Sequence, residues 1–362
     1  MIYLDANATE PLRPEARSAA IAAMDCWGNP SSVHGEGRAA RWVLEAARAS
    51  IAARFGPGSV VFTSGGTEAN ALAIHGLAPG RRVLVGATEH PAVLAAASGA
   101  IVIPVDRQGL VDLAALETLL REGPALVCLM AANNETGVLH PIAEAAALCR
   151  AAGARLHVDA VQLAGRGAVP GGWDSLAISG HKLGGVKGAG ALILAPGVEI
   201  GALIAGGGQE RGRRGGTEPL PAIAAMAAAA ACDPPVFAAL RDGMEERLLA
   251  LAPELVIAGA DVSRLPNTSC LALPGVAAET QVIALDLDGV RVSAGAACSS
   301  GKVARSHVLE AMGFGALAGC AIRVSLPWNA TAADVEGFVD AWAAMRARIS
   351  RPTTRAPISA LR

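Results

Sequence analysis

Two of the three lysines in this chain stand within one short glycine-rich segment, SGHKLGGVKG at residues 179–188. They are Lys182 and Lys187, in a chain with 30 basic residues that are otherwise arginine except for Lys302. Arginine keeps its proton in proteins, whereas burial or neighbouring cations can remove the proton from a lysine. Because only a neutral primary amine forms a Schiff base with an aldehyde, the segment indicates an amine nucleophile beside His181. The alternative is a pair of ordinary surface lysines.

Glycine and threonine mark the point where an expected strand gives way to a helix in TSGGTEANALAI, residues 63–74. The free N–H groups and the positive dipole end of a helix start form a natural seat for a phosphate group. Serine, threonine and glycine also simply cap helices, so a purely structural role stays open for this segment.

Asp159 stands at the end of an expected strand in RLHVDAVQ, residues 155–162. A carboxylate in this place can face a cationic ring nitrogen and stabilise the protonated form of the ring. The alternative is a structural cap on the helix that follows.

Cys298 lies in a loop of small residues, SAGAACSSGK at residues 293–302. A cysteine in an exposed loop is more often reactive than one in an apolar strand, where we place Cys128. An inert thiol in a small-residue turn is the alternative. The seven cysteines form no CxxC pair and the seven histidines are dispersed, so we expect neither a disulfide framework nor a metal site.

The elements that must position these residues are short apolar strands that alternate with alanine-rich helices. The expected strands of the first part of the chain are 60–63, 82–86, 101–105, 126–131, 155–158, 175–178 and 191–194. Continuous apolar runs are typical of strands covered on both faces, so we predict a mostly parallel α/β sheet. The segments that directly follow five of these strands are polar: SGGTE, TEH, NNE, DAVQ and SGHK. Because ligands bind beyond the carboxyl ends of such strands, we predict one composite site there.

The character of the chain changes near Pro234, where a proline break precedes an amphipathic helix. Further strands near 256–257, 268–273 and 322–326 indicate a smaller α+β domain. We therefore predict a large domain over 14–233 and a small domain built from 1–13 and 234–362, which carries the Cys298 loop.

Composition excludes several classes of function. The apolar run 222–232 is shorter than the roughly 18 residues typical of a membrane span, so we expect a buried helix and no membrane association. The N-terminus has no basic region followed by an apolar stretch, from which we expect a cytoplasmic protein. A net charge of −2 and 3% aromatic residues argue against nucleic-acid binding.

Taken together, the motifs resemble the NifS/IscS-like cysteine desulfurases of the class V aminotransferase family. The segments that carry the resemblance run in the family's order over nearly the whole chain: YLDANAT (3–9), GNPSSVH (28–34), VFTSGGTEAN (61–70), TEHPAV (88–93), NNETGV (133–138), HVDAVQ (157–162), SGHKLGGVKGAG (179–190), GGGQERGRRGGTE (206–218), LPNTSC (265–270) and SAGAACSSG (293–301). The resemblance implies a fold-type I enzyme that uses pyridoxal 5′-phosphate (PLP) and works as a homodimer. Glu10 and Pro219 depart from the family pattern, and we expect both changes to be tolerated.

The resemblance also implies roles for the cofactor site. Lys182 would form the Schiff base, Asp159 would pair with the ring nitrogen, and Gln162 would meet the ring hydroxyl. His90 would stack on the ring and act in catalysis. The remaining cofactor contacts would come from Asn134 at the ring and, at the phosphate, from Gly66, Thr67, Ser179 and His181, with Thr217 reaching the phosphate in the partner subunit.

For the substrate, Asn134 and Arg323 would bind the carboxylate, and Arg323 suits this through its planar fork of donors. Cys298 would accept the sulfur as a persulfide. The implied reaction converts L-cysteine to L-alanine, and the sulfur would pass to a protein acceptor for iron–sulfur cluster assembly or thio-modification. A selenocysteine lyase, another class V PLP enzyme and a non-catalytic sulfur-carrier homologue stay open as alternatives.

Overall fold

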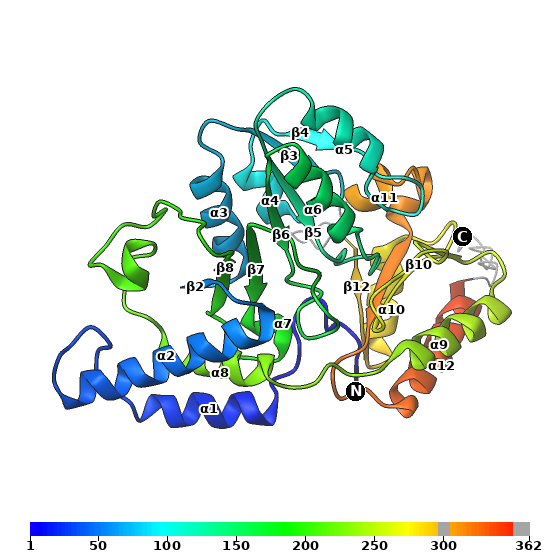
Figure 1. The fold of residues 1–362 in the computed structure, drawn as a ribbon. Coiled ribbons are helices and arrows are strands. Elements are labelled where there is room, and N and C mark those ends of the chain that lie inside the picture. The colour runs from blue at the N-terminus through cyan, green and yellow to red at the C-terminus, as the bar shows by residue number, and fades with distance from the viewer. Residues whose placement is uncertain (296–304, 350–362) are drawn as a thin grey trace, which may run out of the picture.

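A computed structural model of the chain describes residues 1–295 and 305–349. Its largest element is a seven-stranded sheet with the order β2-β8-β7-β6-β5-β3-β4 (Figure 1). The strands are β2 (Ser59–Thr63), β3 (Arg82–Gly86), β4 (Ile101–Ile103), β5 (Ala125–Met130), β6 (Arg155–Asp159), β7 (Ser175–Ser179) and β8 (Gly190–Leu194). Every pair is parallel except the two that β8 makes with β2 and β7. The predicted mostly parallel α/β sheet is confirmed.

Both faces of this sheet are covered, because alternate residues of each strand enter different hydrophobic clusters. Val60 and Phe62 of β2 pack on the face covered by α1, α2, α5, α6 and α8, whereas Val61 packs against α3 and α4. This two-sided burial explains why the strands read as continuous apolar runs.

The helices of this part are α1 (Pro14–Met24), α2 (Gly35–Phe55), α3 (Gly66–Leu77), α4 (Pro91–Ala96), α5 (Leu113–Leu120), α6 (Ile142–Ala151), α7 (Gly180–Leu183) and α8 (Leu220–Ala230). The predicted alanine-rich helix is α8, which is buried along most of its length and packs with α1 and α2 (Figure 1). A short 3-10 helix, η1 (Gln209–Gly212), precedes it.

A second, four-stranded antiparallel sheet has the order β12-β13-β10-β9. Its strands are β9 (Val256–Ile257), β10 (Thr268–Ala272), β12 (Ser293–Ala294) and β13 (Ala321–Ser325). The helices of this part are α9 (Ala238–Leu251), α10 (Ala278–Leu287), α11 (His307–Ala311), α12 (Ala332–Ile349) and the 3-10 helix η2 (Gly315–Gly319), with α9 beside α12 (Figure 1).

The N-terminal segment belongs spatially with residues from the end of the chain. Strand β1 (Ile2–Tyr3) pairs in parallel with β11 (Val290–Arg291), and Leu4 lies in the same hydrophobic cluster as Trp342. The proposed division into 14–233 and into 1–13 with 234–362 stays a prediction.

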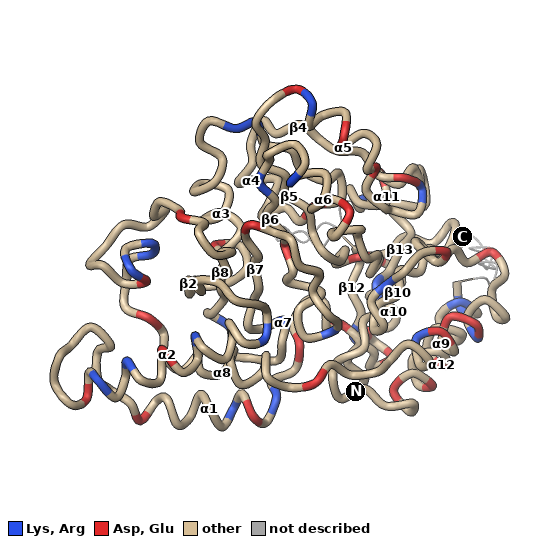
Figure 2. Tube along the Cα trace, in the orientation of Figure 1, with Lys and Arg blue, Asp and Glu red and all other residues tan. Residues whose placement is uncertain are grey.

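Acidic and basic residues are interspersed along the trace (Figure 2). Among the described residues, no helix combines the length and apolar character that a membrane crossing needs. Within the same ranges no group of three or more histidine, cysteine, aspartate or glutamate side chains has the arrangement of a metal site.

Candidate active site

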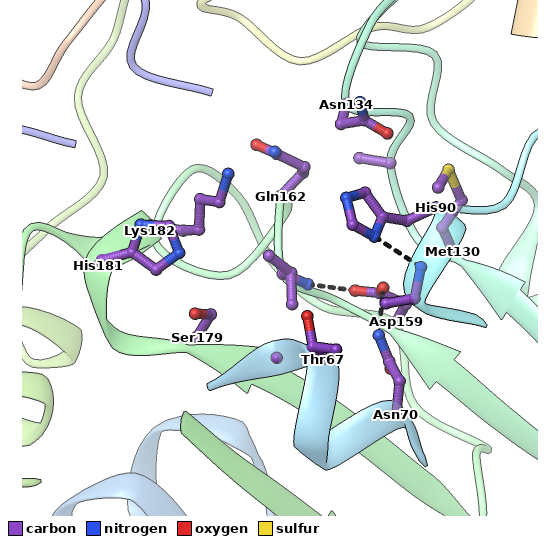
Figure 3. Close-up of a pocket in the computed structure, with 14 residues that line it drawn as sticks. Thr67, Asn70, His90, Met130, Asn134, Asp159, Gln162, Ser179, His181 and Lys182 are labelled. Carbon is purple, nitrogen blue, oxygen red and sulfur yellow. Dashed lines mark hydrogen bonds between the residues drawn. The ribbon is translucent and has the colours of Figure 1, made fainter. Parts of the chain in front are cut away.

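A cavity of about 240 Å³ opens at the carboxyl ends of the parallel strands of the large sheet. The predicted residues that line it are Gly66, Thr67, His90, Asn134, Asp159, Gln162, Ser179, His181 and Lys182. Figure 3 shows Lys182 and His181 on one side of the cavity and His90 and Asp159 on the other. The polar segments after β2, β3, β5, β6 and β7 therefore do meet at one site.

Lys182 lies in the single-turn helix α7, directly after β7. The helix ends at Gly184, whose φ of +92° is a left-handed conformation that glycine adopts without strain. The Lys182 ammonium donates to the backbone carbonyl oxygens of Asn7 and, at 3.0 Å, of Ala8. Burial, followed by the charge of Arg323, lowers the pKa of Lys182 from 10.5 to about 7.

The two lysines of the glycine-rich segment thus have different environments. Lys187 is exposed and does not line the cavity. A pKa of about 7 leaves roughly half of the Lys182 side chains neutral at pH 7, which is the state that attacks an aldehyde. Lys182 has the properties of the expected amine nucleophile.

Asp159 ends β6 and lies at the floor of the cavity, 6% exposed. Its Oδ2 accepts a hydrogen bond of 2.7 Å from Asn70 Nδ2, and its Oδ1 accepts one of 2.9 Å from the backbone N–H of Val161. Burial raises the pKa of Asp159, while both hydrogen bonds oppose this shift. A cation placed against the carboxylate would favour its charged form further.

A buried chain of hydrogen bonds fixes the amide that holds Asp159. Because Asn70 donates through Nδ2, its Oδ1 must accept from His157 Nε2, at 2.9 Å. His157 Nδ1 then accepts from the Ser175 hydroxyl at 2.8 Å. Burial lowers the pKa of His157 to about 4, so this histidine is a neutral ring with its proton on Nε2. The carboxylate of Asp159, which can only accept, therefore sets the direction of the whole chain of hydrogen bonds.

The start of α3 approaches β7 and β8 closely. A Cβ atom at Gly66 would lie 2.7 Å from Val161 Cγ2, and one at Gly190 would lie 2.5 Å from the carbonyl carbon of Gly65. Glycine at these positions lets the helix start, with its free N–H groups, sit beside Ser179 at the rim of the cavity.

His181 adds a donor on the same side. Its Nδ1 lies 2.8 Å from Thr9 Oγ1, and burial lowers its pKa to about 4. When the neutral ring accepts at Nδ1 from the Thr9 hydroxyl, its Nε2–H is free to donate into the cavity.

His90 and Asn134 come from the segments after β3 and β5. His90 is the N-cap of α4, where its Nδ1 accepts from the backbone N–H of Ala92 at 3.1 Å, and Pro91 starts the helix. This contact orients the imidazole, which lines the cavity. The neighbouring Glu89 is buried, and its pKa is raised well above the ordinary value by burial and by the charge of Asp159.

Arg323 lies on β13 and lines a second cavity of about 430 Å³ that shares His90, Asn134, Gln162 and Lys182 with the first. Its Nη2 donates to Asp5 at 2.7 Å and its Nη1 to the Asn134 carbonyl at 3.1 Å. Its Nε is buried and has no hydrogen-bond partner among the described residues. Nη1 and Nη2 each use one N–H in these contacts, so each keeps a second N–H for a ligand in the cavity, as expected for a residue that binds a carboxylate.

Two predicted residues are not part of this constellation. Thr217 is exposed and lines neither cavity. Cys298 lies outside the described residues, although Gly295 and Arg305, which flank that range, both line the second cavity.

The structure adds site residues to which the sequence alone assigned no role. Asn70 belongs to the motif VFTSGGTEAN. It follows Thr67 by three residues on α3, and this helical spacing, which puts both residues on one face, could have indicated that Asn70 also faces the site. Asp5 and Asn7 belong to the segment YLDANAT, but nothing in the sequence shows that they meet Arg323 and Lys182. Glu10 is also more central than expected, because it is 6% exposed and paired with buried Arg166.

The donor set fits PLP. Lys182 supplies an amine of lowered pKa for the aldehyde, and Asp159 supplies a buried carboxylate for the ring nitrogen. The start of α3, Ser179 and His181 supply hydrogen-bond donors for the phosphate.

Comparison with known proteins agrees with this chemistry. The chain matches the model of the family described as Aminotransferase class-V over residues 2–338. A cysteine desulfurase of Cereibacter sphaeroides is 43% identical, with 94% of each chain covered. A cysteine desulfurase of Rhodobacter capsulatus is 41% identical, covering 92% of this chain and 93% of the relative.

Solved structures of related proteins have the same fold as this chain. A NifS-like protein from Rickettsia africae superimposes with a TM-score of 0.89 at 36% identity, covering 96% of this chain and 99% of that one. A structure of SspA in complex with cysteine has a TM-score of 0.79 at 30% identity, covering 90% and 99% of the two chains. The resemblance inferred from the motifs is confirmed.

Proposed function

This chain belongs to the class V aminotransferase family, and from that premise we propose that it is a PLP-dependent L-cysteine desulfurase. The observation that carries the proposal is the pairing of Lys182, a half-buried amine with a pKa of about 7, with the buried carboxylate of Asp159 across one cavity. A fold alone does not define a reaction, but this pair of groups suits a cofactor with an aldehyde and a ring nitrogen.

We assign the cofactor contacts by combining motif position with the lining of the cavity. Asp159 would hold the ring nitrogen, Gln162 would meet the ring hydroxyl and His90 would stack on the ring. Asn134 would contact the ring, and Gly66, Thr67, Ser179 and His181, which line the same cavity, would hold the phosphate. Bound PLP supplies the electron sink that makes bonds at the Cα and Cβ atoms of the substrate labile.

The chain's own groups then perform three tasks. Arg323 binds the substrate carboxylate through the remaining N–H groups of its two terminal nitrogens, aided by Asn134. Lys182 removes and returns a proton at the substrate Cα atom, because its lowered pKa makes it a base near neutral pH. His90 is held by its N-cap contact in reach of the same space and assists proton movement at the substrate sulfur.

Cys298 is the proposed sulfur acceptor. Its thiolate attacks the substrate sulfur, so that an S–S bond forms while the Cβ–S bond breaks and the bonding pair passes to the substrate carbon. Protonation of that carbon gives alanine, and the net change is cysteine plus the Cys298 thiol to alanine plus a Cys298 persulfide. Among the described cysteines, burial raises the pKa of Cys149 and Cys270 to about 12, which disfavours either as the nucleophile.

The assembly and the pathway are part of the same proposal. The exposed Thr217 is available to a second copy of the chain, in keeping with a homodimer in which it reaches the partner subunit's phosphate. The persulfide then passes to a protein acceptor for iron–sulfur cluster assembly or thio-modification, and we place this work in the cytoplasm.

The proposal is tested by supplying the purified, PLP-loaded protein with L-cysteine, L-selenocysteine or L-kynurenine and measuring alanine. We expect alanine and sulfide from L-cysteine, and no alanine from the Lys182→Ala variant. Alanine from selenocysteine or kynurenine, with none from cysteine, would replace the proposal by one of the related activities.

A further inference from the structure

A buried ion pair lies behind Lys182. Arg166 Nη2 donates to Glu10 Oε2 at 3.0 Å, and the two side chains are only 4% and 6% exposed. Both residues line a small cavity of about 10 Å³ together with Lys182, a space of roughly one water molecule. Buried ion pairs contribute little net free energy to folding, although removing only one partner is strongly destabilising because it leaves an unpaired buried charge. We therefore look for the role of this pair in the side chains that Arg166 contacts.

Arg166 holds the side chain of Gln162. Its Nη1 donates to Gln162 Oε1 at 2.7 Å and to the Gln162 backbone oxygen at 2.9 Å. Its other terminal nitrogen donates to the Ala6 carbonyl at 3.2 Å as well as to Glu10. The guanidinium therefore ties the N-terminal segment to the turn after β6.

This contact decides which way the Gln162 amide faces. A guanidinium has donors only, so the atom that meets Arg166 must be the amide oxygen and not the nitrogen. Gln162 Nε2 is consequently the end turned away from Arg166, and it donates to the Asn7 carbonyl oxygen at 3.0 Å. Lys182 donates to that same oxygen, which places the Gln162 N–H donors beside the reactive amine.

Glu10 keeps Arg166 in place. Its second oxygen, Oε1, accepts from the backbone N–H of Trp328 at 2.5 Å, so both carboxylate oxygens are used. Burial raises the pKa of Glu10, and the charges of Arg166 and Arg13 oppose this shift. With the carboxylate neutralised, Arg166 would be a buried cation without an anionic partner.

We propose that Arg166, held by Glu10, is a positioning residue that fixes the Gln162 amide with its N–H₂ group toward the ring oxygen of the bound cofactor. This inference rests on the proposed function, because it assumes that PLP occupies the cavity with its ring hydroxyl near Gln162. If the amide were flipped, Gln162 Oε1 would face the ring oxygen of the cofactor, and both atoms are acceptors. In the fixed orientation Gln162 Nε2 donates to that ring oxygen, which carries negative charge.

The test compares two ligands that cannot attach to Lys182: pyridoxine 5′-phosphate and its 3-deoxy counterpart, which lacks the ring oxygen. Binding of each to the cofactor-free protein is measured by titration calorimetry for wild type, Arg166→Met, Gln162→Ala and the double variant. We expect wild type to prefer the ligand with the ring oxygen by about tenfold. Arg166→Met and Gln162→Ala each lose that preference, and the double variant loses no more than either one.

An Arg166→Met variant that keeps the wild-type preference for the ligand with the ring oxygen would overturn the inference. It would also be overturned if the double variant lost the product of the two single-variant losses in preference, because the two residues would then act independently. Arg166 also influences the charge of Lys182, but an effect through Lys182 would persist in the Gln162→Ala background and appear as a further loss in the double variant. If Arg166→Met does not fold, Glu10→Gln gives the same test, because it keeps the shape of the side chain and removes its charge. The preference should fall in that variant, and an unchanged preference would refute the role of the pair.

The two proposals fail in different ways. Wild type that does not retain PLP after borohydride reduction would refute the cofactor chemistry itself. Wild type that retains PLP on Lys182, alongside an Arg166→Met variant with normal ligand preference, would refute only the positioning role.

Discussion

The lowered pKa of Lys182 leads to a prediction about how the cofactor-free protein acquires PLP. The attacking species is the neutral amine, so the rate of attachment should follow the neutral fraction of Lys182. With a pKa of about 7, roughly three-quarters of the amines are neutral at pH 7.5, against about 0.1% for an ordinary lysine of pKa 10.5. The difference corresponds to a rate advantage of several hundredfold at that pH.

The sign of the pH dependence follows from the direction of the shift. A lysine whose pKa is lowered loses its proton earlier as the pH rises, so the neutral fraction increases about tenfold between pH 6 and pH 8 and then levels off. The rate is measured by stopped-flow absorbance after mixing cofactor-free protein with PLP. Dividing it by the rate for N-acetyl-lysine amide at the same pH corrects for the titration of PLP itself. Because the neutral fraction of that reference amine rises tenfold per pH unit, the ratio of the two rates should be constant below about pH 6 and fall about tenfold per pH unit above about pH 8.

The chain offers a matched control for this experiment, because Lys187 lies five residues away in the same glycine-rich segment and is exposed. Lys187→Ala should leave the rate and its pH profile unchanged, and Lys182→Ala should abolish the covalent signal. A wild-type rate that still rises tenfold per pH unit between pH 8 and pH 10 would refute the reasoning, since that is the behaviour of a solvated lysine.

Three further predictions follow from the contacts at the site and in the fold. Asp159→Asn keeps the cavity shape but removes the charge against the ring nitrogen, so alanine production should fall at least about a hundredfold while PLP stays bound, as followed by absorbance; unchanged turnover would contradict the role of the carboxylate. Arg323→Gln should raise the KM for L-cysteine by about ten- to a hundredfold and change kcat less, because one charge-assisted contact with the substrate carboxylate is lost; steady-state kinetics with an unaltered KM would refute it. Glu210→Gln should lower the free energy of unfolding by about 3 kcal/mol in urea titrations, because this buried carboxylate accepts from Arg48 at 2.7 and 2.9 Å; Glu45→Gln, which removes the exposed partner of Arg48, is the control and should cost less than about 1 kcal/mol.

The strands of the large sheet could be predicted because their burial on both faces leaves a direct mark on the sequence. Each strand is a continuous apolar run, and the polar residue that ends it stands out, as Asp159 does after β6. The geometry of parallel strands then brings such residues together at one edge, which is why most of the cavity lining could be named in advance.

The supporting contacts could not be predicted in the same way, because they join residues whose separation in the chain carries no local signal. The hydrogen bonds from Ser175 through His157 to Asn70 link two strands and a helix. Glu10 and Arg166 are 156 positions apart, and each reads alone as an ordinary surface charge. Buried polar partners of this kind are set by tertiary structure, so only the assembled fold reveals them.

The most direct test of the central claim is to react the PLP-loaded protein with one equivalent of L-cysteine, measure alanine and map the added sulfur by peptide mass spectrometry. The account predicts one alanine per transferred sulfur, with the extra sulfur atom on the peptide that contains Cys298 and none on those that contain Cys128 or Cys270. In the Cys298→Ala variant PLP should stay bound while sulfide release is lost. Alanine formation at the wild-type rate in that variant, or a sulfur adduct on another cysteine, would contradict the account.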